Sequence, residues 1–165
     1  MEIDTETIRR LRETLLATAR SSVAATPEVP AGALKEAIVR LLRPFAETMY
    51  LVMAADGISE DDEIATLVGA LELLCDGRLT RADLHDLVDT FPAYSDLHDQ
   101  EARIAQLGAV LGAQKADREM AFTLAAVVAL ADRSVAVEEH SVLQLVGEYL
   151  GISPTRADEL LTGMR

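Results

Sequence analysis

Apolar residues recur every three or four positions along most of the chain, and strict apolar–polar alternation is nearly absent. This spacing is typical of α-helices that bury one face, and it indicates no β-sheet. Four of the clearest stripes are Ile8, Leu11, Leu15, Ala19 and Val23; Leu34, Ile38, Phe45, Met49 and Val52; Ile64, Leu67, Val68, Leu71 and Leu74; and Ile104, Leu107, Val110 and Leu111. The pattern predicts an all-α protein, a compact bundle of about seven or eight helices.

Helix ends are marked by capping, glycine and proline residues. Thr80 with Asp83 makes a near-capping box, which is expected to open a helix. Gly151 is expected to close the helix that precedes it, because glycine adopts the left-handed conformation at low cost. Ser153 followed by Pro154 has the pattern of an N-cap and a first helical residue, so a short last helix is expected there.

One interruption falls inside an apolar stripe. Pro44 removes a backbone hydrogen bond and clashes with the preceding turn, so a kink or a break is expected near Arg43. At this length the chain is expected to form a single domain. Its expected parts, within residues 1–165, are a first helix over 4–25, a linker over 26–33, a repeat-containing core over 34–153 and a short final helix over 154–165.

Composition narrows the choice of partners. Hydrophobic residues make up 50% of the chain but aromatic residues only 4%, so aliphatic side chains must fill the core. The formal net charge of −13 argues against nucleic acid and anionic membrane surfaces, because both bind basic patches. The start of the chain is acidic, unlike a signal peptide, and no apolar stretch approaches the ~18 residues of a transmembrane helix. We therefore expect a cytoplasmic protein without direct membrane insertion.

Catalytic signatures are missing, and no enzyme is expected. Cys75 is the single cysteine, and its place in an apolar helical phase predicts a buried thiol. His140 follows Glu139 and would favour zinc as a nitrogen ligand, but we expect it on a helix surface. An enzyme in which a carboxylate-bound metal activates water is kept as an alternative.

One short pattern occurs twice. An Ala-Asp pair ending at Asp56 is followed after six residues by Glu63, and another ending at Asp132 is followed after six residues by Glu139. An apolar helical stretch runs into each aspartate, and another runs out of each glutamate. A repeated helix–acidic turn–helix unit can fold back with pseudo-twofold symmetry, which would bring all four acids together.

Such a carboxylate cluster would need compensation. Two like charges ~4 Å apart repel by about 4 kcal/mol at an effective dielectric constant of about 20. Four converging carboxylates therefore require a cation, raised carboxyl pKa values or backbone N–H donors. Oxygen ligands favour calcium or magnesium, with zinc or manganese as further candidates. Alternatively the turns do not meet, and the four acids are ordinary turn and helix-start residues.

The two acidic turns resemble those of the TerB family of tellurite resistance proteins. The resemblance rests on residues 53–57 with Glu63 and on residues 129–132 with Glu139, and it spans residues 34–153. A related domain is similar to the N-terminal part of some membrane-anchored DnaJ-type co-chaperones. The resemblance implies an α-helical fold with pseudo-symmetric halves and a bound divalent cation.

The implied metal ligands are Asp56, Glu63, Asp132 and Glu139, and the auxiliary candidates are Glu60, Asp61 and Glu138. The second turn departs from the family pattern, because Arg133 stands where the first turn has Gly57. A left-handed arginine would cost about 1 kcal/mol relative to glycine. Its positive charge would also compete with a cation.

These features favour a non-enzymatic, divalent-metal-binding TerB-like protein, and the resemblance implies a role in tellurite resistance or a related stress response. The alternative is a metal-free helical protein–protein interaction module. It rests on Arg133, on the strong negative charge and on the amphipathic first helix outside the repeat. That helix would either dock on the bundle or offer an apolar face to a partner.

Overall fold

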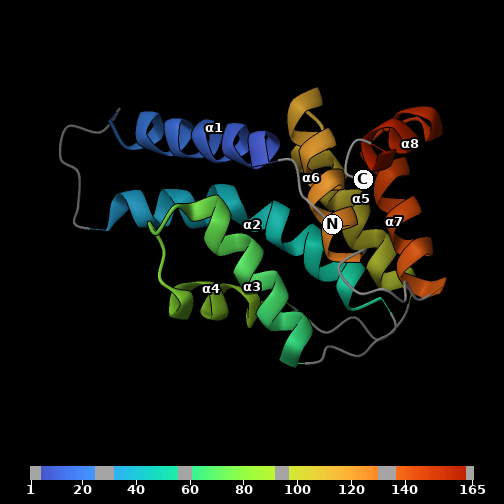
Figure 1. Ribbon diagram of the computed structural model, residues 1–165, viewed down its shortest axis with the longest axis horizontal. Helices are drawn as coiled ribbons and strands as arrows, with labels where there is room; N and C mark the ends of the chain where they lie inside the picture. Colours follow the sequence, from blue (N-terminus) through green and yellow to red (C-terminus); the bar gives the residue numbers. More distant parts are fainter. Residues whose placement is uncertain (1–4, 25–31, 56–60, 92–96, 130–136, 163–165) are drawn as a thin grey trace.

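The computed structural model describes residues 5–24, 32–55, 61–91, 97–129 and 137–162. These residues form eight α-helices and no β-strand (Figure 1), as the apolar spacing predicts. The helices are α1 (Thr5–Ala24), α2 (Ala33–Met53), α3 (Asp61–Cys75), α4 (Arg81–Val88), α5 (Leu97–Leu111), α6 (Lys115–Ala129), α7 (Val137–Tyr149) and α8 (Pro154–Thr162). Not one of them is both long and apolar enough to cross a membrane.

The helices fall into two units of four that share a pattern of neighbours (Figure 1). In the first unit α1 packs on α2 and α3, and α2 packs on α3 and α4. In the second unit α5 packs on α6 and α7, and α6 packs on α7 and α8. The second helices of the two units, α2 and α6, form the most extensive contact between elements. The same order of contacts therefore recurs in the two units.

Helix α2 is shared by the two units. It contacts α1, α3 and α4 of its own unit and α5, α6 and α7 of the other. Every residue from Phe45 to Met53 is buried. A helix that is buried on all sides belongs in the interior of a bundle. The C-terminal half of α2 is therefore the centre of the fold.

Helix α2 continues through Pro44, so the chain does not break near Arg43, and the kink named as the other outcome stays a prediction. Proline in a helix interior costs about 3 kcal/mol through a lost hydrogen bond and a steric clash. Leu42, Phe45 and Met49 are buried on both sides of this position, and burial of each such side chain stabilises by about 1.5–3 kcal/mol. Tertiary packing therefore holds the two halves of α2 in one helix.

The helix ends predicted from capping residues are confirmed. The Thr80 hydroxyl accepts the Asp83 backbone N–H at 3.3 Å, and the Asp83 carboxylate accepts the Thr80 N–H at 3.0 Å, which completes the capping box of α4. Gly151 follows α7 with a left-handed φ of 66°. The Ser153 side chain accepts the Arg156 N–H at 3.3 Å at the start of α8. Each of these signals acts within a few residues of its own position.

The core is aliphatic, and Cys75 is fully buried in it, as predicted. Helix α1 docks on this core through Leu15, Leu16 and Ala19, which are all buried.

The prediction that Val110 lies on the buried face of α5 is wrong, because this side chain is 67% exposed. Val110 is one residue from Leu111, which turns it by about 100° away from the buried stripe.

Candidate functional site

The two acidic turns occupy matching places in the two units. The first turn joins α2 to α3, and the second joins α6 to α7. Asp56, Glu60 and Asp132 lie outside the residues that the structure describes, as does Arg133. Glu138 and Glu139 belong to the first turn of α7 and are described only by their backbone.

Asp61 and Glu63 are the candidate ligands whose side chains are described. Both lie in the first turn of α3, where Asp61 is exposed and Glu63 is half-buried. Acidic residues are favourable at this end of a helix because the backbone N–H groups carry a partial positive charge there. Within the described ranges, no three histidine, cysteine or acidic residues form a group that could hold a metal ion.

The helices that follow the two turns begin on either side of the C-terminal end of α2 (Figure 1). Helix α2 contacts both α3 and α7. The first turn of α3, which carries Glu63, therefore lies apart from the first turn of α7, which carries Glu139. The meeting of Asp56 and Asp132 concerns residues outside the described part of the chain and stays a prediction.

Gln100 is a polar residue buried beside the first acidic turn, and the sequence pattern does not reveal it. It lies in the first turn of α5 and is 3% exposed. Its Nε2 donates to the carbonyl oxygen of Ala54 at 3.4 Å, two residues before Asp56. This bond fixes the orientation of the amide, and its Oε1 has no hydrogen-bond partner among the described residues. A buried acceptor without a donor costs about 1–3 kcal/mol.

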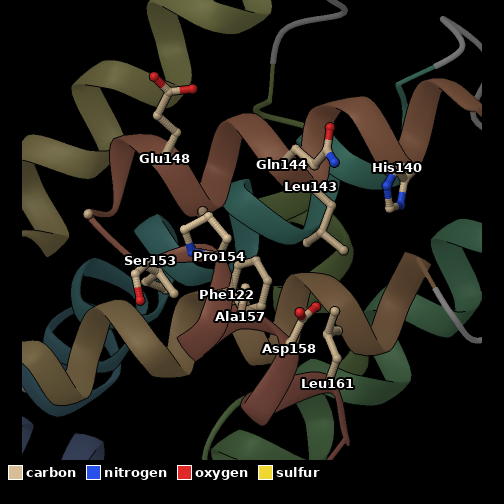
Figure 2. A pocket seen from close by; sticks show the side chains of 13 residues that line it. Phe122, His140, Leu143, Gln144, Glu148, Ser153, Pro154, Ala157, Asp158 and Leu161 are labelled. Atoms are coloured by element: carbon tan, nitrogen blue, oxygen red, sulfur yellow. The ribbon is translucent and has the colours of Figure 1, made fainter.

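A pocket of about 620 Å³ opens between α7 and α8, and we call it the α7–α8 groove (Figure 2). The ring of Phe122 from α6 forms its floor, and Leu143 and His140 reach into it from α7. The opposite wall is made by α8, with Asp158 and Leu161. His140 is exposed at this site, as predicted for a helix surface residue.

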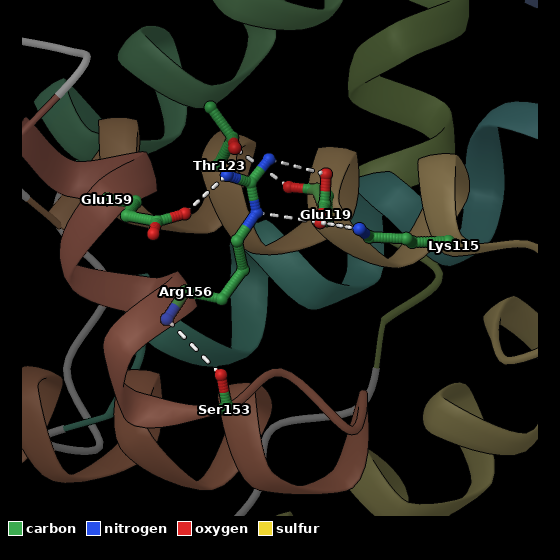
Figure 3. Close-up of polar contacts among 6 residues, drawn as sticks. All are labelled: Lys115, Glu119, Thr123, Ser153, Arg156 and Glu159. Atoms are coloured by element: carbon green, nitrogen blue, oxygen red, sulfur yellow. Dashed lines mark hydrogen bonds and ion pairs between the residues drawn. The ribbon is translucent and has the colours of Figure 1, made fainter.

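Helix α8 is fixed to α6 by charged groups (Figure 3). Arg156 donates from Nε and Nη2 to the two carboxylate oxygens of Glu119, at 2.8 and 3.0 Å, and from Nη1 to Glu159 at 2.7 Å. The Nζ of Lys115 lies 3.5 Å from the same Glu119 carboxylate. The hydrogen bonds from Arg156 lower the pKa of Glu119 below its ordinary value. The network holds α8 in place although no residue of α8 is buried.

A family model described as tellurite resistance protein TerB matches residues 45–161. The match runs from the middle of α2 into α8, so it includes both acidic turns and Gln100, and α1 precedes it. It starts later than the resemblance noted over residues 34–153 and extends further toward the C-terminus. No curated protein and no solved structure matches the chain. The family match covers most of the residues and agrees with the all-helical fold: the chain belongs to the TerB family of tellurite resistance proteins.

Proposed function

We propose that this TerB-family chain binds divalent cations at its two acidic turns and acts, without catalysing a reaction, in tellurite resistance or a related stress response. The observation that carries the proposal is the buried Oε1 of Gln100 beside the first turn. Amide carbonyl oxygens are common ligands of hard cations, as are carboxylates. A cation near Ala54 would therefore give Oε1 of Gln100 a partner, which this atom lacks among the described residues.

The proposed ligands are Asp56, Glu63, Asp132 and Glu139, with Glu60, Asp61 and Glu138 as auxiliary candidates. All of these donors are oxygen atoms, so calcium or magnesium is favoured over zinc or manganese. When bound, the cation would neutralise carboxylates at the ends of α2 and α6. It would thereby strengthen the contact between the two units, which is a structural role and not a catalytic one.

The melting temperature in EDTA and in calcium, magnesium, manganese or zinc tests this proposal. Binding to the folded state alone stabilises a protein by about 2.7 kcal/mol at about a hundredfold excess over Kd. We expect such a shift in the wild type and its loss in the double variant Asp56→Asn with Asp132→Asn. No shift with any of the four cations would refute cation binding.

A control variant and a binding stoichiometry sharpen this experiment. Asp86→Asn with Asp89→Asn removes the same charge from two exposed acids at α4 and should leave the shift unchanged. Isothermal calorimetry then gives the number of cations per chain. Two cations per chain mean that each turn binds its own. With one cation per chain, loss of binding in both single variants, Asp56→Asn and Asp132→Asn, means that the two turns meet, and loss in one variant alone means that only that turn binds.

Gln100→Met tests the contribution of the amide oxygen. Methionine has a similar length but offers no oxygen, so the affinity for the cation should fall by at least about tenfold. In EDTA the variant should be about as stable as the wild type, because removal of the acceptor without a donor offsets loss of the 3.4 Å hydrogen bond to Ala54. An unchanged affinity would remove Gln100 from the site and leave the acidic turns to be judged by their own variants.

A metal-free interaction module is the second candidate function. Among the apolar residues of α1 whose side chains are described, Leu15, Leu16 and Ala19 are packed on the bundle, so this part of the helix does not offer an apolar face to a partner. Deleting residues 1–30 should therefore lower the melting temperature. The observation that favours an interaction function lies at the other end of the chain, in the α7–α8 groove.

A further inference from the structure

The last helices of the two units pack differently. In the first unit α4 packs closely on α3 and buries Leu84, Leu87 and Val88. In the second unit α8 contacts α6 and has no buried residue. Its apolar residues Leu160 and Leu161 are only half-buried. The α7–α8 groove is therefore an opening in the second unit, at a place where the corresponding helices of the first unit, α3 and α4, are packed together.

The groove has the length and lining of a site for a helix. It follows α7 from His140 to Gly151, a distance of about 16 Å or three helical turns. Phe122 is 2% exposed and Leu143 is 6% exposed, so a firm apolar floor lies between the two helices. An amphipathic helix binds such a groove by placing its apolar face against the floor.

Charge specifies the polar side of the occupant. The carboxylate of Asp158 faces the groove from α8 (Figure 2) and has no partner among the described residues. Among the described residues of α7 and α8, Arg156 is the one lysine or arginine, and it is engaged with Glu119 and Glu159; the imidazole of His140 lies at the α7 wall of the groove. The chain as a whole carries a formal charge of −13. An occupant with lysine or arginine beside its apolar face complements this surface.

We propose that the α7–α8 groove binds an amphipathic helix of a partner protein, with its apolar side chains on Phe122 and Leu143 and a lysine or arginine beside Asp158. This inference is independent of cation binding at the acidic turns. A second copy of the chain fits less well, because its basic amphipathic helix, α1, already packs Leu15, Leu16 and Ala19 on its own core.

The test uses a fluorescein-labelled synthetic helix of leucine and lysine, about 18 residues long, and a version with glutamate in place of lysine. Fluorescence anisotropy should show saturable binding of the lysine peptide, one peptide per chain, and no binding of the glutamate peptide. Ala157→Phe, which fills the groove from the α8 wall, should weaken binding by at least about tenfold. Leu161→Ser is the second groove variant, used if the first does not fold by circular dichroism.

Matched charge variants separate a specific site from general attraction. Asp158→Lys should weaken binding by at least about tenfold, whereas Asp86→Lys on α4 makes the same charge change far from the groove and should have little effect. Equal losses in both charge variants, or full binding to folded Ala157→Phe or Leu161→Ser, would overturn the proposal. Formation of dimers at the concentrations used, with loss of peptide binding, would assign the groove to a second copy and would also overturn it.

Discussion

Arg103 of α5 holds Glu47 of α2 through two hydrogen bonds of 2.6 Å, from Nε to Oε1 and from Nη2 to Oε2. The side chain of Glu47 is 2% exposed and lies within the fully buried half of α2. A carboxylate at such a place is tolerated only with a partner, because loss of its hydration is costly. The pair therefore fixes the second unit to the helix that both units share.

Arg103→Met should lower the free energy of unfolding by about 3–5 kcal/mol, because it removes the guanidinium that forms two hydrogen bonds with the buried Glu47 carboxylate. Urea denaturation of the variant and the wild type measures the loss. Arg9→Met is the control, since it removes the exposed ion pair of Arg9 with Glu13 and should cost less than about 1 kcal/mol. Similar small losses in both variants would show that water screens the buried pair.

Gly108 marks a close approach of α5 to α7. A Cβ atom added at this position would lie 2.5 Å from the backbone carbonyl oxygen of Tyr149. Because the obstacle is backbone, Gly108→Ala has to push the two helices apart, and it should lower the free energy of unfolding by about 1–3 kcal/mol. Chemical denaturation gives the value.

The matched control is Gly69→Ala in the interior of α3. No atom lies within 4 Å of a Cβ added there. Alanine has the higher helix propensity, so this variant should be more stable than the wild type by about 0.5–1 kcal/mol. If the two alanine variants changed stability in the same direction, the close contact of α5 with α7 would not explain the effect of a Cβ atom at position 108.

The capping box of α4 should make stability depend on pH in the acidic range. A hydrogen bond from Lys35, and then those from Thr80, lower the pKa of Asp83 from 3.8 to about 2. Because this pKa is lower in the folded than in the unfolded chain, the contacts stabilise fully above pH 3.8 and lose their effect as the pH falls toward 2.

Asp83→Asn tests this dependence. The difference in the free energy of unfolding between wild type and variant should be constant above about pH 5 and should close on acidification. Denaturant titrations across this range measure it. A difference that grows as the pH falls would contradict the assigned contacts of Asp83.

The only thiol of the chain should be unreactive in the folded state. Burial raises the pKa of Cys75 to about 12, and its side chain is fully buried. Since the thiolate is the reactive form, Ellman's reagent should label Cys75 only as fast as the protein unfolds. Leu73→Cys in a Cys75→Ala background is the control, because position 73 is 57% exposed and should react at once. Fast labelling of Cys75 would contradict its burial.

Sequence reasoning succeeded where the cause is local. The capping box of Thr80 and Asp83 and the start of α8 at Pro154 depend on residues a few positions apart, and both are confirmed. The chain does not break at Pro44, because packing of distant residues around α2 keeps the helix continuous there. A local rule gives the intrinsic preference of a residue but not the contacts that override it.

Less of the candidate site could be predicted from the sequence. Gln100 bonds to a residue 46 positions away, and Arg103 bonds to one 56 positions away, so no spacing rule points to either. The groove depends on how closely α8 approaches α7, and the apolar stripe of α8 does not reveal this. Of the four main predicted metal ligands, Asp56, Glu63, Asp132 and Glu139, only Glu63 has a side chain that the structure describes.

Helix α2 contacts α1, α3, α4, α5, α6 and α7, whereas α8 packs mainly on α6. We therefore expect the first seven helices to unfold together and α8 to open before them. In native-state hydrogen exchange, the amides of α2 should report the global unfolding free energy and those of α8 a much smaller local one. That result would make one wall of the α7–α8 groove a separate cooperative unit, which moves while the rest of the fold stays intact.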